Sequence, residues 1–204
     1  MQKTLYYVHD PMCSWCWGFE PTRRQLFAAL ADRLQIERLV GGLAPDTDEP
    51  MPATMRNMLQ QTWHRIASSI PGTEFNFEFW EKCQPRRATY PANRAVIAAR
   101  AQGDEFDTRM TERIQRAYYL EARNPSDDST LIELAADIGL DCEQFADELA
   151  SAALQRQLLQ EIQRSRMLGI DSFPSLAVEK SGQLHHIGLN YTDAQAMRAQ
   201  IEAI

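Results

Sequence analysis

The fold of this 204-residue chain is decided by residues 9–19, which read His-Asp-Pro-Met-Cys-Ser-Trp-Cys-Trp-Gly-Phe. Two cysteines, Cys13 and Cys16, stand between a short apolar run and the start of an expected helix. A sulfur in the first turn of a helix lies among unpaired backbone N–H groups and the positive end of the helix dipole, which both favour a thiolate over a thiol. The position therefore predicts a two-cysteine redox centre in which Cys13 attacks and Cys16, one helical turn further on, resolves.

The residues around this centre predict a strand–helix–strand unit. Residues 5–8 are rich in aromatic and β-branched side chains, which favour a strand, and residues 36–40 predict a second one. Between them, apolar side chains recur at steps of three and four over residues 19–34, which is the pattern of one buried helix face. Pro21 must end the first turn or kink the helix, and we expect the kink. Such a unit has parallel strands and a right-handed crossover.

A second signal lies near the C-terminal end, where residues 169–178 read Gly-Ile-Asp-Ser-Phe-Pro-Ser-Leu-Ala-Val. A proline that enters a strand belongs at its first residue or at a sheet edge, and we expect Pro174 to follow a cis peptide bond there. Residues 175–178 and 184–187 predict a hairpin around residues 181–182. A capping box over residues 192–195 predicts the start of a last helix.

The chain between these two parts predicts a helical insertion. A polar, proline-punctuated linker covers residues 44–52, and a helix is expected over residues 53–70. Further helix starts and ends are predicted at Pro91, Gly103, Asp104, Leu120, Thr130, Gly139, Asp141 and Ser151. Aromatic side chains gather over residues 75–80, where they could belong to the core or line a substrate groove.

Charge and composition limit which kinds of binding partner and which cellular compartment we expect for this protein. The formal net charge is −7 and no basic cluster occurs, so neither nucleic acid nor an anionic membrane is expected as a partner. The apolar run near Met1 is too short for a signal-peptide core, so we expect a cytoplasmic protein. There a structural disulfide is improbable, and a C-x-x-C pair should be catalytic, redox-sensing or metal-binding.

With these motifs in place, the chain resembles the DsbA family of the thioredoxin superfamily, and Cys-Ser-Trp-Cys-Trp-Gly-Phe is similar to its cytosolic, FrnE-like branch. The matching residues are Cys13, Cys16, Pro21 and Pro174. The resemblance implies an α/β, thioredoxin-like fold (βαβ…ββα) with an inserted all-helical domain. The thioredoxin-like domain would comprise residues 1–44 and 167–204, and the inserted helical domain residues 45–166.

The resemblance also implies a thiol-disulfide oxidoreductase or isomerase whose partners are protein or peptide thiols and disulfides. Cys13 and Cys16 would be catalytic, and Ser14, Trp15, Phe173 and Pro174 would contact the substrate. No organic cofactor or metal is expected, glutathione stays open as a co-substrate, and the protein would be a monomer or a homodimer. The inner dipeptide differs from the family's Pro-His, so the redox potential cannot be carried over. No clear match is found for the buried acidic residue that many thioredoxins place beneath the second cysteine.

Other residues have plainer interpretations. Cys83 and Cys142 lack a partner at redox spacing, so we expect surface or core thiols. A zinc site through Cys13, Cys16, Cys83 and a histidine lacks any finger or ribbon spacing. His9 could favour the Cys13 thiolate as a cation, but a hydrogen-bonded histidine at a strand end is the commoner case.

Two other functions remain open. One is a glutathione-dependent isomerase or kappa-type transferase, which uses a single Ser or Cys to activate glutathione; the presence of both cysteines argues against it. The other is a redox-gated peptide-binding (holdase) module, in which the helical insertion holds peptides and the cysteines only sense the redox state.

Overall fold

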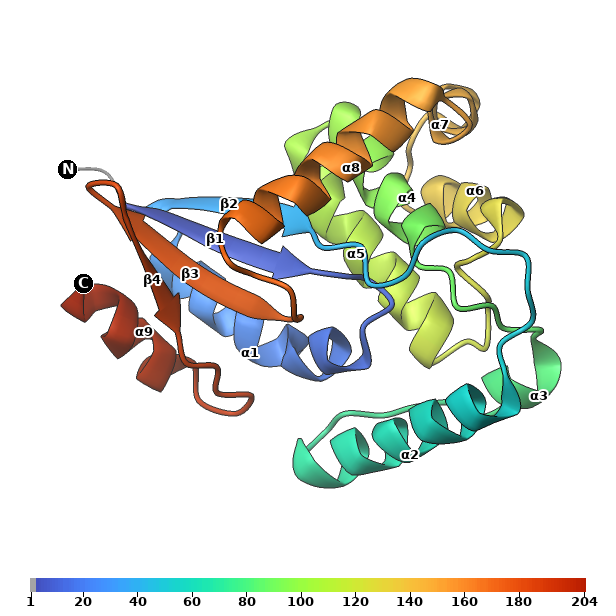
Figure 1. Cartoon of the computed structure of the whole chain (residues 1–204), viewed down its shortest axis with the longest axis horizontal. Helices are drawn as coiled ribbons and strands as arrows, with labels where there is room; N and C mark the ends of the chain where they lie inside the picture. The colour runs from blue at the N-terminus through green and yellow to red at the C-terminus, as the bar shows by residue number, and fades with distance from the viewer. Residues whose placement is uncertain (1–2) are drawn as a thin grey trace.

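The computed structural model describes residues 3–204 and contains one mixed four-stranded sheet (Figure 1). Its strands are β1 (Thr4–His9), β2 (Gln35–Val40), β3 (Ser175–Lys180) and β4 (Gln183–Ile187). They lie in the order β2-β1-β3-β4. β1 and β2 are parallel, whereas β3 is antiparallel to both β1 and β4. The predicted strand–helix–strand start and the hairpin close are both confirmed.

Side chains of β1 alternate between two buried faces, as a central strand requires. Leu5 and Tyr7 pack with α1 (Ser14–Leu30) and α9 (Ala194–Ala203), which lie together on one face of the sheet (Figure 1). Tyr6 and Val8 belong to a separate cluster on the other face. The sheet is therefore covered on both sides, and the end of β1 is held firmly where it leads into Cys13.

The helix that follows β1 continues through Pro21 instead of ending there. Its N-cap residue is Cys13, so the first cysteine lies at the junction of turn and helix, as predicted. The last helix, α9, begins one residue later than the predicted capping box implies. Its N-cap is Asp193, whose carboxylate accepts hydrogen bonds from the backbone N–H groups of Gln195 and Ala196. Thr192 is therefore not the cap, because the charged carboxylate reaches these donors instead.

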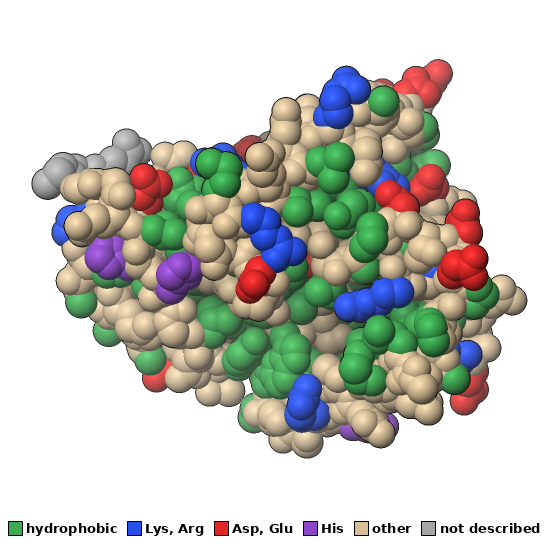
Figure 2. All heavy atoms as spheres, in the orientation of Figure 1, with side chains coloured by type: hydrophobic (Ala, Val, Ile, Leu, Met, Phe, Trp, Pro, Cys, Tyr) green, Lys and Arg blue, Asp and Glu red, His purple; other side chains and the backbone are tan. Residues whose placement is uncertain are grey.

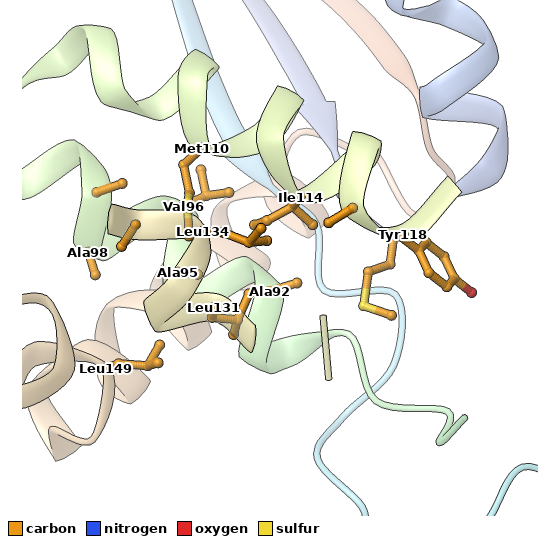
Figure 3. Packing of buried hydrophobic residues seen from close by; sticks show 14 of the residues in the cluster. Ala92, Ala95, Val96, Ala98, Met110, Ile114, Tyr118, Leu131, Leu134 and Leu149 are labelled. Atoms are coloured by element: carbon orange, nitrogen blue, oxygen red, sulfur yellow. The ribbon is translucent and has the colours of Figure 1, made fainter. Parts of the chain in front are cut away.

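Seven helices lie between β2 and β3 in the described part of the chain. They are α2 (Ala53–Ser69), α3 (Phe79–Lys82), α4 (Tyr90–Ala101), α5 (Asp104–Tyr119), α6 (Asp128–Asp137), α7 (Cys142–Leu149) and α8 (Ala152–Met167). Alanines of α4 face Met110 and Ile114 of α5 and Leu131 and Leu134 of α6 in one buried cluster (Figure 3). The small side chains of α4 let its neighbours approach closely. The expected limits of the insertion, residues 45 and 166, stay a prediction.

The predicted caps of these helices are only partly right. Asp141 and Ser151 cap α7 and α8 through their side chains, as expected. Asp104 lies inside α5, whose N-cap is Gly103. Thr130 lies inside α6, because the backbone N–H of Leu131 already bonds the carbonyl of Asp127 and starts the helix earlier.

Helix α8 returns the chain to the sheet and covers the edge strand β2 (Figure 1). A carboxylate oxygen of Glu161 accepts a hydrogen bond of 2.9 Å from the backbone N–H of Val40. This contact satisfies a donor at the open edge of the sheet, where an unpaired strand would otherwise be exposed. The loop after α8 then carries Phe173 and Pro174 to the end of β1.

Candidate redox site

Cys13 and Cys16 lie at the start of α1, and both are free thiols. The backbone N–H of Cys13 bonds the carbonyl of Asp10 at 3.0 Å, which closes the turn between β1 and α1. Cys13 is 7% exposed and Cys16 is fully buried. Burial raises the pKa of the Cys16 thiol well above its ordinary value, and the neighbouring Cys13 adds to this shift. Cys13 is thus the more exposed of the two cysteines, and the raised pKa favours the thiol form of Cys16.

The loop before β3 reaches the same point from the other end of the chain. The thiol of Cys13 donates a hydrogen bond of 3.3 Å to the carbonyl of Phe173. The peptide bond between Phe173 and Pro174 is cis, and Pro174 is buried. The ring of Phe173 lies against the backbone of Gly41, where an added Cβ would come within 2.1 Å of two ring atoms. Close packing on Gly41, just after β2, therefore fixes the carbonyl that faces Cys13.

A buried acidic residue, Asp10, lies beside the cysteine pair, where no acid was found from the sequence. Its carboxylate accepts hydrogen bonds from the backbone N–H groups of Met12 and Leu43 and from the side chains of Thr89 and Asn93. Burial raises the pKa of the Asp10 carboxyl, and these four donors act against that shift. In the sequence, Asp10 precedes a proline and indicates only the end of a strand. Its burial could not be predicted, because its partners at positions 43, 89 and 93 are distant in the sequence.

The two inner residues of the motif have different surroundings. Ser14 is buried, and its hydroxyl accepts a hydrogen bond of 3.0 Å from the indole N–H of Trp63. Trp15 is half-buried, with Tyr191 at its edge and the guanidinium of Arg65 over its ring. Of the two, Trp15 is the more exposed.

The aromatic residues 75–80 are mainly core rather than a groove. The rings of Phe75, Phe77, Phe79 and Trp80 surround Trp63 at centroid distances of 4.9–6.0 Å. Apolar side chains are nevertheless gathered on the surface between the sheet and α2 (Figure 2). Leu43, which follows β2 and whose N–H binds Asp10, is 36% exposed.

His9 is not a cation that favours the Cys13 thiolate. Burial, together with the positive charges of nearby arginines, lowers the pKa of His9 to about 3, so the ring is neutral at pH 7. The alternative expectation, a hydrogen-bonded histidine, is also wrong, because neither ring nitrogen has a hydrogen-bond partner among residues 3–204. The ring instead stacks on Tyr7, with centroids 4.8 Å apart. Its strand position places it on the face buried by α1, which the sequence pattern did not reveal.

The thiols of the two remaining cysteines form hydrogen bonds with backbone carbonyls away from this site. The thiol of Cys83 donates to the carbonyl of Ala122, and that of Cys142 to the carbonyl of Leu140. Within the described part of the chain, no three His, Cys, Asp or Glu side chains gather closely enough to hold a metal ion. Across residues 3–204, every helix falls short of the length and apolarity that a bilayer crossing requires.

Comparisons with known proteins identify the family. A family model described as thioredoxin matches residues 6–200, so the chain belongs to this family. A candidate protein disulfide isomerase from Nitrosomonas europaea is 28% identical, with a TM-score of 0.87 over 100% of this chain and 97% of that one. The cytosolic disulfide reductase DsbM from Pseudomonas aeruginosa is also 28% identical, with a TM-score of 0.77 over 98% and 97% of the two chains. The protein has a DsbA-like thioredoxin fold.

Curated relatives carry a different name. The ClpXP adapter protein SpxH from Halalkalibacterium halodurans is 25% identical over 175 residues, which cover 84% of this chain and 56% of that protein. The SpxH from Bacillus subtilis is 24% identical over a similar stretch. The chain thus spans just over half the length of the curated relatives it matches.

Proposed function

We propose that this protein is a thiol-disulfide oxidoreductase in which Cys13 attacks and Cys16 resolves. The observation that carries the proposal is the position of Cys13. It is the N-cap residue of α1, its thiol donates a hydrogen bond to the carbonyl of Phe173, and it lies next to a fully buried second cysteine. Amides at the start of a helix stabilise a thiolate, which is the nucleophile in thiol-disulfide exchange.

In the first step, the Cys13 thiolate attacks one sulfur of a substrate disulfide. The substrate S–S bond breaks, a mixed disulfide forms on Cys13, and the other substrate sulfur leaves as a thiolate that takes a proton. An extended substrate segment would lie along Phe173 and Pro174, with Trp15 against it. The hydrogen bond between the Cys13 thiol and the Phe173 carbonyl supports this arrangement, because it brings that backbone segment next to the attacking sulfur.

In the second step, Cys16 loses its proton and attacks the sulfur of Cys13. The mixed disulfide breaks, the Cys13–Cys16 disulfide forms, and the substrate leaves with two thiols. Burial and the nearby Cys13 raise the pKa of Cys16, while the backbone N–H of Asp10 lowers it. Once Cys13 is bonded to substrate it carries no charge, so one cause of the raised pKa disappears and Cys16 ionises more readily.

We further propose a cytosolic reductase or isomerase that acts on protein or peptide disulfides, with glutathione as a co-substrate. In the cytosol glutathione and thioredoxin keep thiols reduced, so a C-x-x-C pair rests in the dithiol form and removes disulfides. DsbM, whose chain is similar over nearly its full length, is described as a cytosolic disulfide reductase and has a structure with GSH. Run in reverse, the same two steps would oxidise a substrate dithiol and reduce the Cys13–Cys16 disulfide.

A second candidate is a peptide-binding module whose cysteines only sense redox state. The names of the curated relatives favour it, since they are called adapters of ClpXP. Under this alternative the helical insertion and the apolar surface beside α2 would hold a partner, and turnover would be absent. A kappa-type glutathione transferase is less well supported, because it would need only one of the two cysteines.

A trapping experiment tests the oxidoreductase proposal. The Cys16→Ser variant, incubated with a disulfide-bonded peptide, should accumulate a covalent adduct on Cys13 that a reducing agent releases. The Cys13→Ser variant should form none, and Cys142→Ala, which keeps both active-site cysteines, should turn over the peptide as wild type does. Absence of the adduct, with peptide binding and folding intact, would favour the binding module. Unchanged conjugation of glutathione to a small electrophile by Cys16→Ser would favour the transferase.

A further inference from the structure

One side chain of the helical insertion forms a hydrogen bond with Ser14, one of the two residues between the cysteines. The indole N–H of Trp63, in α2, donates a hydrogen bond of 3.0 Å to the hydroxyl of Ser14. Trp63 is fully buried and Ser14 is 8% exposed, so water cannot easily replace either partner. A buried hydrogen bond of this kind is expensive to break, because the indole donor would then lack any partner.

Trp63 is held in a rigid surrounding. Its ring lies 5.0 Å from that of Phe75, 4.9 Å from that of Trp80 and 5.4 Å from that of Tyr119, measured between centroids. Such a set of packed rings leaves little freedom for the indole to follow a movement of Ser14. The hydrogen bond thus fixes the serine to a part of the chain that moves little.

Other contacts from α2 and the loop after it reach the same turn of α1. The indole N–H of Trp17 donates a hydrogen bond of 3.0 Å to the carbonyl of Glu74. Gly18 lies so close to Ile70 that an added Cβ would come within 2.7 Å of that side chain. Together with the Trp63–Ser14 hydrogen bond, these contacts anchor the turn on both sides of Cys16. Arg65 of α2 also lies over the ring of Trp15, but the hydrogen bond from α2 to the residues between the cysteines comes from Trp63.

We propose that Trp63 is a positioning residue that shifts the redox equilibrium of Cys13 and Cys16 toward the dithiol by anchoring Ser14. Forming a disulfide draws the two sulfurs to about 2.05 Å and the Cβ atoms to about 3.8 Å, and this requires the backbone between them to adjust. The hydrogen bond to Ser14 is present with both cysteines free, so it belongs to the dithiol geometry. Movement of Ser14 on oxidation stretches it and disfavours the disulfide. The inference rests on the proposed exchange chemistry.

The test is the equilibrium with glutathione. In this reaction the protein dithiol and GSSG give the protein disulfide and two GSH: the glutathione disulfide breaks, the Cys13–Cys16 disulfide forms, and two electrons and two protons pass to glutathione. The fraction oxidised is read by alkylation and mass spectrometry across a series of glutathione ratios. Trp63→Phe keeps an aromatic ring but removes the donor, and Ser14→Ala removes the acceptor. Each should raise the equilibrium constant for disulfide formation about five-fold, the effect of one net hydrogen bond.

Trp80→Phe is the matched control. Trp80 is buried in the same aromatic cluster, and its indole N–H has no hydrogen-bond partner among residues 3–204. This variant therefore alters the packing without removing a hydrogen bond, and its equilibrium constant should equal that of wild type. The double variant Ser14→Ala/Trp63→Phe should shift the constant no further than either single variant, because both remove the same bond.

Several outcomes would overturn the inference. They are an unchanged or lowered constant in Trp63→Phe and Ser14→Ala, additive shifts in the double variant, or an equal shift in Trp80→Phe. If Trp63→Phe fails to fold, Ser14→Ala alone decides the question. Failure of wild type to form any Cys13–Cys16 disulfide with GSSG would instead contradict the proposed function, so the two failures are distinguishable.

Discussion

The side-chain amide of Asn93 donates a hydrogen bond of 2.8 Å to the buried carboxylate of Asp10, and so ties α4 to the turn that carries Cys13. The hydroxyl of Thr89 and the backbone N–H of Leu43 bond the same carboxylate oxygen. The segment around Leu43 and the start of α4 therefore meet the turn between β1 and α1 at one acidic side chain. The candidate redox site is assembled around Asp10 as much as around the cysteines.

We expect Asp10→Asn to lower the free energy of unfolding by about 3 kcal/mol, because an amide group turns a donor toward N–H and O–H groups that need an acceptor. Urea denaturation followed by circular dichroism measures this change. Asp171→Asn is the matched control, since Asp171 is an exposed carboxylate in the loop before Phe173. Equal stabilities of the two variants would show that the four hydrogen bonds to Asp10 contribute little.

Gly41→Ala should impair disulfide exchange more than folding. The new Cβ would meet the ring of Phe173 at 2.1 Å, so the ring must move, and with it the carbonyl that faces Cys13. We expect the rate of reduction of a peptide disulfide to fall roughly ten-fold or more, since small misplacements at a reacting centre are costly. The loss of stability should be about 1–3 kcal/mol.

Gly188→Ala serves as the control for that experiment. Its added Cβ would come no closer than 3.3 Å to the end of the flexible Gln200 side chain. Both the exchange rate and the stability of Gly188→Ala should stay near those of wild type. An unchanged exchange rate in Gly41→Ala would mean that the position of Phe173 does not matter for the reaction.

The parts of the fold that depend on local patterns were predictable from the sequence. Strand β1, the placement of Cys13 at the start of α1, and the β3–β4 hairpin after Pro174 follow from residue types and spacings within a few positions of each other. Helix starts were less predictable, because several side chains near one another could serve as the cap. At α9 the N-cap is Asp193 rather than the predicted Thr192.

The parts of the site that depend on distant contacts were not predictable. The burial of Asp10 requires donors from Leu43, Thr89 and Asn93, and no short pattern links these residues. The contact between Trp63 and Ser14 joins residues 49 positions apart. His9 was misjudged for the same reason: its neutral state follows from burial by elements that pack onto β1 only in the folded chain.

Cys83 and Cys142 should be dispensable for turnover. Each thiol donates to a backbone carbonyl, and each side chain is half-buried. We expect Cys83→Ala and Cys142→Ala to lose about 1 kcal/mol of stability at most and to keep wild-type turnover per folded molecule in a peptide-disulfide reduction assay. Cys13→Ser, assayed alongside, should be inactive. Loss of activity in either alanine variant would reveal a role for that cysteine in the redox cycle.

His9 should make the protein less stable as the pH falls below neutrality. Its pKa is about 3 in the folded protein, against an ordinary value of 6.5, because burial disfavours the charged ring. Between these two values the unfolded chain binds a proton that the folded protein does not, so the free energy of unfolding decreases as the pH is lowered through this window. His9→Phe keeps a ring on Tyr7 but cannot titrate. Relative to this variant, wild type should lose about 2 kcal/mol of unfolding free energy between about pH 8 and pH 5, measured by urea denaturation at each pH.

Tyr7→Phe is the control: burial raises the pKa of the Tyr7 hydroxyl well above its ordinary value, so this hydroxyl stays neutral over this range. Its stability should therefore follow the pH dependence of wild type, and a His9→Phe curve that also runs parallel to wild type would contradict the neutral, buried histidine.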